Sequence, residues 1–397
     1  MGKVRSLRIP TLALACSLAG AAAALGIGSL AGWLGSGTSR TVVLQQTLSQ
    51  PAAAVSRSLS TPGFDPARIY ALRSPGVVTL YSLFGDRTAQ GSGFVVSSAG
   101  VILTSSHVIT DAGDGGSPSV SAADSVYVEF ADHDRIPAKI VGWDVYDDVG
   151  VVRVDPKAHP LSPVPLGDSD VVRVGQPVAA IGSPFGNENS LGVGVVSATH
   201  RSIESLTSTY DLVDAIQTDA PINHGNSGGP LFDAEGRVIG INAQIRSDSG
   251  NAEGVGFAVP IDSARRSLEQ LLSSGHVSYA YVGISTEDLT PSLARHLHFE
   301  VPAGALIDSV LPGGPGDRAG LRGGTSDEPF EGMDVKRGGD VVVGIDGHPV
   351  RGAQDLVRIV SEVLRPGQKA HFTILRGERR LVVPVVLAAR PSNPHGG

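Results

Sequence analysis

Short apolar runs separated by turn-forming residues dominate residues 66–275. Stretches rich in β-branched residues recur between clusters of Gly, Pro, Asp and Ser, a pattern that predicts many short strands. Strands at this spacing favour a β-sandwich or a β-barrel. Residues 261–276 instead carry apolar positions at helical intervals, and Gly275 provides a stop signal, so we expect a helix there. The predicted strands lie within 76–82, 91–105, 125–132, 138–144, 148–155, 176–184, 191–199, 214–220, 229–245 and 254–260.

A different pattern extends from residue 279 to residue 388. Short strand-like stretches alternate with two helix-like stretches, at 291–297 and 353–364, which predicts a small α+β module. The connection 322–340 in this module is unusually long. Residues 389–397 have the composition of a disordered tail.

The N-terminus combines a basic flank, residues 1–8, with a long uncharged span, residues 9–34. The span is long enough to cross a bilayer and exceeds the roughly 7–15 apolar residues of a secretory signal, so it predicts a transmembrane anchor. A cleaved signal peptide is the alternative, because Ala21 to Ala24 offer small-residue cleavage sites. Both interpretations export the chain beyond Leu34, and residues 35–65 have the composition of a flexible linker.

Composition narrows the class of protein. Of the 397 residues, 41% are apolar and 18% are charged, which is typical of globular domains. The formal net charge of −8 gives no reason to expect nucleic acid as a partner. The single cysteine, Cys16, lies in the N-terminal span, so the exported part can form no intrachain disulfide.

The stretch INHGNSGGPLFD, residues 222–233, surrounds one serine with three glycines. A serine hydroxyl needs a nearby base to become a nucleophile, and the reaction needs N–H donors for the oxyanion. Glycines around Ser227 would let the backbone turn tightly, so that the turn Gly225-Asn226-Ser227 forms an oxyanion hole with the N–H groups of Gly225 and Ser227. A Gly-rich turn with an incidental serine is the alternative.

Two further segments supply partners for this serine. His107 follows an apolar strand that ends in small residues, and Asp148 starts another apolar strand, with Asp147 as a competing carboxylate. The chain order His, Asp, Ser is that of chymotrypsin-type triads.

Together, the segments GSGFVV, TSSHVI, DVYDDVGVV, AIQTDAPINHGNSGGPLFD and GVGFAVP resemble the protease domain of the HtrA (Deg) family over residues 66–272. The resemblance implies a chymotrypsin-like double β-barrel with the site between the barrels. It assigns His107 as general base, Asp148 as the orienting carboxylate and Ser227 as nucleophile. The family pattern has a small residue two positions after the aspartate, and Gly150 in that place selects Asp148. Relatives are commonly trimers, for which Phe64 or Tyr70 are weighed as interface residues against a place in the core.

Two departures from digestive proteases bear on mechanism. Asn226, not an aspartate, precedes the nucleophile, so a freshly cut N-terminus would find no buried carboxylate, and activation by cleavage of a pro-segment is disfavoured. The family resemblance implies instead a rearrangement of surface loops that complete the oxyanion hole. Pro221 stands where trypsin-like enzymes keep a specificity aspartate, so the pocket favours small or medium apolar P1 residues. His224 is interpreted as an exposed turn histidine.

The C-terminal segments YVGIS, GALIDSVLPGGPGDRAGL and GGDVVVGIDGHPV resemble a PDZ domain over residues 279–388. Such a domain adds a peptide as a strand and captures its terminal carboxylate in a backbone nest. The resemblance assigns the peptide-binding loop to Tyr281, Val282, Gly283 and Ile284, whereas the alternative is a strand start with a packing glycine.

We therefore expect a mostly β, exported serine endopeptidase that cleaves misfolded or exposed polypeptides and is regulated by C-terminal peptides at its PDZ domain. No metal or other cofactor is expected. The alternative is a catalytically silent chaperone or peptide-binding scaffold. Membrane association would come from the N-terminal segment, and the relatives imply a homotrimer.

Overall fold

The computed structural model describes residues 63–112, 120–183, 189–208, 210–222, 225–243 and 255–391. The predicted N-terminal span, Cys16 and His224 lie outside these ranges. No helix within the described ranges is both long and apolar enough to cross a bilayer.

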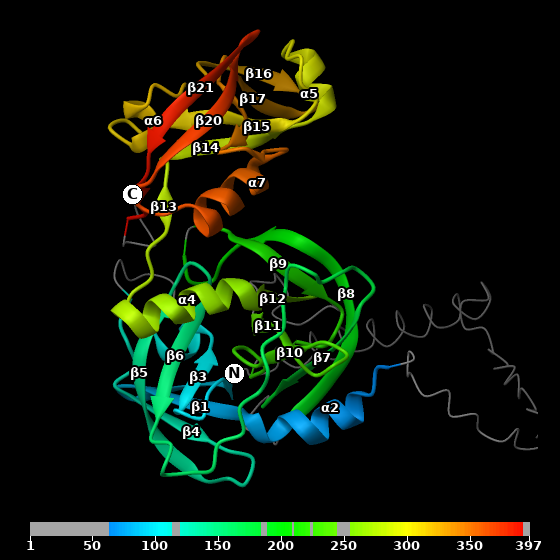
Figure 1. Ribbon diagram of the computed structural model, residues 1–397, viewed down its shortest axis with the longest axis vertical. Helices are drawn as coiled ribbons and strands as arrows, with labels where there is room; N and C mark the ends of the chain where they lie inside the picture. The colour runs from blue at the N-terminus through cyan, green and yellow to red at the C-terminus, as the bar shows by residue number, and fades with distance from the viewer. Residues whose placement is uncertain are drawn as a thin grey trace, which may run out of the picture. The chain divides into compact units, whose positions relative to one another are not determined.

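The first six strands close into an antiparallel barrel in the order β1-β2-β3-β6-β5-β4, coloured blue to teal in Figure 1. Both faces are buried in β3, in most of β6, in the first half of β1 and in the second half of β2. Leu80 and Val95 point into the barrel, whereas Val77 and Phe94 pack into a second core shared with the next barrel. This explains why their sequences read as continuous apolar runs. The strands are β1 (Val77–Phe84), β2 (Arg87–Val95), β3 (Val101–Thr104), β4 (Ser125–Glu129), β5 (Arg135–Asp144) and β6 (Val149–Val154).

A second antiparallel barrel comes next, in the order β10-β11-β12-β9-β8-β7, coloured green in Figure 1. The apolar stretch predicted at 229–245 is two strands, joined by a turn in which the carboxylate of Asp233 accepts the N–H groups of Glu235 and Arg237. Two barrels confirm the double-barrel prediction. The strands are β7 (Pro177–Gly182), β8 (Ser190–Ile203), β9 (Leu212–Thr218), β10 (Pro230–Phe232), β11 (Val238–Ala243) and β12 (Gly256–Pro260).

Helix α4 (Ile261–Ser274) packs against β5 and β6 of the first barrel and β11 and β12 of the second (Figure 1). Its apolar face, including Leu268 and Leu271, joins the core shared by the two barrels. As predicted, the helix stops at Gly275, which adopts a left-handed φ of 76° and donates its N–H to the carbonyl of Leu271. The helix therefore connects the two barrels by packing against strands of both.

Two short helices in the double-barrel part of the chain were not predicted. In α2 (Pro66–Arg73), the Asp65 carboxylate caps the N–H of Arg68 and Pro66 occupies the first turn. This Asp-Pro pair is a recognisable start signal. A 3₁₀ turn (Ser74–Gly76) comes after it, and α3 (Ser106–Ile109) is a single turn directly after β3.

The C-terminal module is a sheet in the order β14-β15-β18-β20-β21, with β19 paired to β18 and a separate pair β13-β22. The long connection 322–340 contains a hairpin, β16-β17, whose Phe330 and Val335 pack in a core with Leu293 of α5. The hairpin accounts for the extra length of this connection. The strands are β13 (Ala280–Tyr281), β14 (Ile284–Leu289), β15 (Gly304–Val310), β16 (Ser326–Phe330), β17 (Met333–Arg337), β18 (Val341–Ile345), β19 (His348–Pro349), β20 (Lys369–Arg376), β21 (Arg379–Val386) and β22 (Ala388–Ala389). The helices are α5 (Pro291–His296), α6 (Pro315–Arg318) and α7 (Ala353–Arg358), the last continued by a π-helical turn (Ile359–Val363).

Candidate active site

The first barrel brings His107 and Asp148 together. His107 lies on α3, just after β3, and Asp148 ends the turn between β5 and β6, which is the strand next to β3. The Nδ1 atom of His107 lies 2.8 Å from Oδ2 of Asp148. A bond to Nδ1 leaves Nε2 as the nitrogen that can accept a proton.

The carboxylate of Asp148 is buried and fully engaged. Its Oδ1 accepts the hydroxyl of Ser106 at 2.7 Å and the backbone N–H of His107 at 3.1 Å. Asp148 itself has a φ of +50°, a conformation that costs energy for a residue with a side chain. Gly150 allows the close approach of this turn, because a Cβ there would lie 2.9 Å from the carbonyl oxygen of Ser105.

Electrostatics favour the charged pair. Burial alone would lower the pKa of His107, but the charge of Asp148 and the bond to it raise that pKa above its usual value overall. Burial opposes ionisation of Asp148, yet attraction to His107 and the bonds from His107 and Ser106 hold its pKa below the usual range. The pair is therefore organised to stabilise an imidazolium.

Asp147, the competing carboxylate in the sequence, occupies a different environment. Within the described residues it makes no hydrogen bond to His107, whereas Asp148 makes two. Burial and the neighbouring charge of Asp144 raise the pKa of Asp147 to about 7. The structure thus distinguishes Asp148, which bonds to His107, from Asp147, a choice that the residue types alone did not decide.

The turn Gly225–Gly229 lies against β2. The backbone N–H of Ser92 donates to the carbonyl of Ser227 at 2.8 Å, and the Ser92 hydroxyl donates to the carbonyl of Gly225 at 2.5 Å. At Gly228, φ is +83° and a Cβ would lie 2.5 Å from Oγ1 of Thr104. Sequence reasoning overlooked Ser92, although its position between two glycines of β2 is a signal of close backbone approach.

The hydroxyl of Ser227 is buried and unpaired. Within the described part of the chain, its Oγ has no hydrogen-bond partner, so it is not joined to His107 in this conformation. The same range gives no acceptor for the N–H groups of Gly225 and Ser227. A hydroxyl and two N–H donors on one turn are the groups needed for acyl transfer.

Pro221 and Asn226 are in contact. The amide nitrogen of Asn226 lies 3.3 Å from the carbonyl oxygen of Pro221. Gly192 of β8 lets Pro221 approach, because a Cβ on Gly192 would lie 3.0 Å from the proline ring. Pro221 therefore stands beside the turn that carries Ser227.

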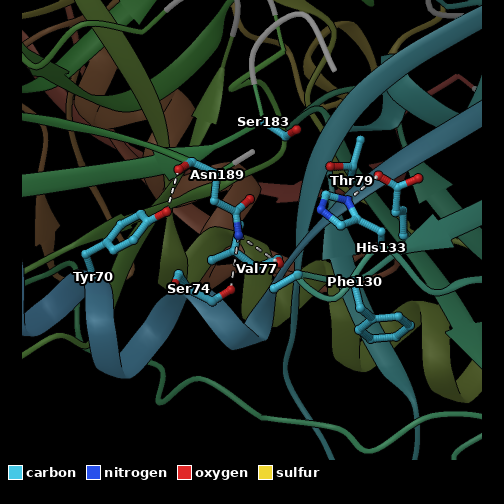
Figure 2. Close-up of a pocket in the computed structure, with 10 residues that line it drawn as sticks. Tyr70, Ser74, Val77, Thr79, Phe130, His133, Ser183 and Asn189 are labelled. Atoms are coloured by element: carbon cyan, nitrogen blue, oxygen red, sulfur yellow. Dashed lines mark hydrogen bonds and ion pairs between the residues drawn. The ribbon is translucent and has the colours of Figure 1, made fainter. Parts of the chain in front are cut away.

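A separate cavity has a volume of about 110 Å³. Figure 2 shows the residues that line it. The Tyr70 hydroxyl on α2 donates to the carbonyl of Asn189 at 2.6 Å, and the Asn189 side chain donates to the carbonyls of Ser74 and Val77. None of the described residues that line this cavity belongs to the predicted triad. Tyr70 is thus tied to its own chain, and Phe64, 3% exposed, lies in the core.

The predicted peptide-binding segment spans the end of β13 and the start of β14. Val282 is buried, Gly283 adopts a φ of +75°, and their carbonyls accept the N–H groups of Gly316 and Leu311. β14 is an edge strand of its sheet. An edge strand next to a left-handed glycine offers unpaired backbone groups to an added peptide strand.

Comparisons with known proteins agree with both halves of the chain. Residues 91–241 match the trypsin-like peptidase domain family, and residues 280–387 match the PDZ domain family. Over 310 residues the chain is 39% identical to a probable periplasmic serine endoprotease DegP-like of Pseudomonas fulva (strain 12-X), covering 78% of this chain and 58% of that protein. Over 356 residues it is 36% identical to the protein so named from Pseudomonas fluorescens, covering 88% and 68%.

Solved structures give the same result. The structure described as HtrA-type protease AlgW with tripeptide aligns with a TM-score of 0.68 at 33% identity, over 82% of this chain and 98% of that one. A serine endoprotease from Yersinia pestis aligns with a TM-score of 0.59 at 27% identity, over 82% and 98%. The chain spans 58% of the length of the DegP-like relatives from Pseudomonas fulva (strain 12-X) and Pseudomonas putida (strain W619).

Proposed function

Because the chain belongs to the HtrA family of DegP-like serine proteases, we propose that it hydrolyses peptide bonds of misfolded or exposed polypeptides through Ser227, His107 and Asp148. The observation that carries the proposal is the buried 2.8 Å contact between His107 Nδ1 and Asp148 Oδ2. A buried imidazole held by a carboxylate is the base that a serine nucleophile requires.

In the proposed reaction, Asp148 keeps the proton on Nδ1 of His107. Nε2 takes the proton of Ser227 as its Oγ bonds to the scissile carbonyl carbon. His107 then gives that proton to the leaving amine, and water, activated by the same nitrogen, hydrolyses the acyl-enzyme. The raised pKa of His107 matches this role, because the imidazolium formed in each step is stabilised.

We assign the oxyanion hole to the turn Gly225-Asn226-Ser227, with the N–H groups of Gly225 and Ser227 as donors. The unpaired Ser227 hydroxyl supports activation by rearrangement, since the nucleophile and its base have still to come together. Catalytic hydrogen bonds commonly tighten only when substrate binds. Asn226 next to the nucleophile gives no carboxylate for a cleaved N-terminus, so the trigger is a loop movement rather than removal of a pro-segment.

Pro221 determines specificity in this proposal. A proline here supplies no counter-charge for a basic side chain, so a small or medium apolar P1 residue is preferred. We infer that the C-terminal module regulates cleavage by binding C-terminal peptides at Tyr281, Val282, Gly283 and Ile284, along the edge of β14. The AlgW structures carry a tripeptide or a decapeptide.

We place the catalytic domain outside the cytoplasm. The DegP-like relatives are named as periplasmic, and the sequence offers a basic flank followed by the uncharged span 9–34. A single-pass anchor at 9–34, with Lys3, Arg5 and Arg8 on the cytoplasmic side, is our proposal for that span. Assembly as a homotrimer is proposed from family membership.

The direct test is labelling with a fluorophosphonate, which reacts with activated serines. The parent chain should take up the label and cleave casein. Ser227→Ala should abolish labelling and lower cleavage by about 10⁶, as in comparable triads. Ser121→Ala, which removes an exposed hydroxyl, is the matched control and should keep both. Casein cleavage by Ser227→Ala at the parent rate would refute the assignment and favour the silent scaffold.

A further inference from the structure

A second buried carboxylate, Asp144, lies four residues before Asp148. Asp144 ends β5 and is 2% exposed, and the turn that it begins leads directly to Asp148 at the start of β6. The proposed mechanism gives Asp144 no role. A buried carboxylate is costly unless hydrogen bonds replace its lost water, so its surroundings need an explanation.

Four donors surround this carboxylate. Two lie within the turn itself: the backbone N–H groups of Tyr146, at 3.0 Å, and Asp147, at 3.4 Å, both point to Oδ1. Two are hydroxyls from elsewhere in the chain. Ser267 of α4 donates to Oδ2 at 2.7 Å, and the Tyr279 hydroxyl donates to the same oxygen. Asp144 therefore ties the backbone of the turn to α4 and to the segment that comes after it.

The turn needs such support because of its conformation. Asp148 has a φ of +50°, a region that residues with a Cβ populate sparsely. The direction of its carboxylate toward His107 depends on that conformation. Bonds that fix the preceding residues thus act on the catalytic pair without touching the substrate.

Tyr279 occupies a particular place in the sequence. It is the last residue before β13 and lies two residues before Tyr281, where the proposed peptide-binding segment begins. Its ring is buried and packs edge-on against Tyr146, with the centroids 5.5 Å apart. Its carbonyl accepts the N–H of Arg390, which comes directly after β22, and the Arg390 guanidinium lies over the Tyr146 and Tyr279 rings. Tyr279, which begins the module, and Arg390, just after its last strand, thus meet at the turn that carries Asp148. The prediction of a disordered tail from residue 389 is therefore wrong at its start, because Ala389 lies in β22 and Arg390 is packed against these rings.

We propose that Asp144 is a positioning residue for the Asp148–His107 pair, and that the Tyr279 hydroxyl, on the segment leading into the PDZ domain, holds Asp144 in place. A displacement of that segment releases one of the two hydroxyl donors, and the turn relaxes. The inference rests on the proposed protease function. It adds a physical connection between the module and the catalytic carboxylate.

The test compares three single substitutions in the full chain. Tyr279→Phe and Ser267→Ala each remove one hydroxyl from Asp144 while keeping the buried side chain close to its original shape. The Tyr279 hydroxyl also bonds to Asp147, so Ser267→Ala is the variant that changes Asp144 alone. Tyr146→Phe is the matched control, because it removes a phenolic hydroxyl of the same cluster that bonds to the carbonyl of Pro391 instead. The readouts are kcat and KM on a fluorogenic peptide with an apolar P1 residue, per active site counted by fluorophosphonate, across pH.

Tyr279→Phe and Ser267→Ala should each lower kcat about 10-fold with KM unchanged, the loss that ~1.4 kcal/mol of transition-state stabilisation gives. The acid limb of kcat/KM should move to lower pH, because a loosened Asp148 no longer raises the pKa of His107. A purely structural role would reduce the number of active sites and leave that limb in place. Tyr146→Phe should match the parent.

The inference is overturned when Tyr279→Phe keeps the parent kcat and acid limb, or when Tyr146→Phe loses as much. Should Tyr279→Phe fail to fold, Ser267→Ala tests the same set of donors from α4. A parent chain that takes no label at Ser227 would overturn the proposed function first, and this inference with it.

Discussion

Two adjacent residues in the β5–β6 turn carry the same side chain in opposite electrostatic environments. Asp148 faces His107 and Ser106, which hold its pKa below the usual range against the effect of burial. Burial and the charge of Asp144 raise the pKa of Asp147 to about 7, although the Tyr279 hydroxyl and the charge of Arg266 act in the opposite direction. The residue types alone did not decide whether Asp147 or Asp148 is the partner of His107. In the structure the turn directs the carboxylate of Asp148 at the imidazole.

This difference predicts that Asp148→Asn lowers kcat, whereas Asp147→Asn does not. Asp148→Asn should lower kcat by about 10⁴, because the imidazole loses its orienting charge, as in comparable triads. Asp147→Asn should keep the parent kcat. A large loss of kcat in Asp147→Asn with a normal Asp148→Asn would reverse the assignment.

Asp147→Asn also tests the raised pKa of Asp147, because that pKa makes the free energy of unfolding depend on pH. Between about pH 4 and about pH 7 the folded chain holds a proton that the unfolded chain has released, so stability falls as pH rises through this window. Asp147→Asn removes that cost, and at pH 8 its Tm should exceed that of the parent by about 2–4 °C. The advantage should shrink at pH 5, and a constant difference at both values would contradict the shift.

At the scale of elements, the turn Gly225–Gly229 depends on close contact with β2 and β3. Gly228 combines a left-handed φ with a Cβ position 2.5 Å from Oγ1 of Thr104. Gly275, the cap of α4, has a similar φ of 76° but nothing within 4 Å of its Cβ position. Comparing substitutions at Gly228 and Gly275 therefore separates the energetic cost of a left-handed backbone from the cost of contact between an added Cβ and its neighbours.

Gly275→Ala should therefore lower the free energy of unfolding by only about 1–2 kcal/mol and leave kcat unchanged. Gly228→Ala should cost more and should abolish fluorophosphonate labelling, because the turn that carries Ser227 must move away from Thr104. Urea unfolding and labelling of both variants measure the difference. Equal losses of stability with intact labelling would show that crowding at Gly228 is unimportant.

Some secondary-structure elements could be predicted from the sequence and others could not. Apolar runs and Gly275 predicted most barrel strands and the end of α4, because several of the strands, such as β3 and β11, are buried on both faces. α2 was overlooked, although Asp65 caps it, because its apolar periodicity is weak. The donors around Asp144 were also beyond prediction, since Ser267 and Tyr279 are far from it in sequence and meet it only in the folded chain.

For the whole molecule, the order of two barrels, α4 and a PDZ module could be predicted from the pattern of apolar positions and the family resemblance together. Pattern alone offered a sandwich or a barrel, and the resemblance selected two barrels. The predicted membrane span and His224 lie outside the described residues, so they remain predictions. The account depends on Ser227, His107 and Asp148 meeting at one point between the barrels.

A crystal structure of the fluorophosphonate-treated chain measures that meeting point directly. We expect phosphorus bonded to Oγ of Ser227, with Nε2 of His107 facing that oxygen and Asp148 still on Nδ1. The phosphoryl oxygen should lie about 2.7–3.1 Å from the N–H groups of Gly225 and Ser227. An adduct on another residue, or a His107 ring whose Nε2 does not face the modified Ser227, would contradict the account.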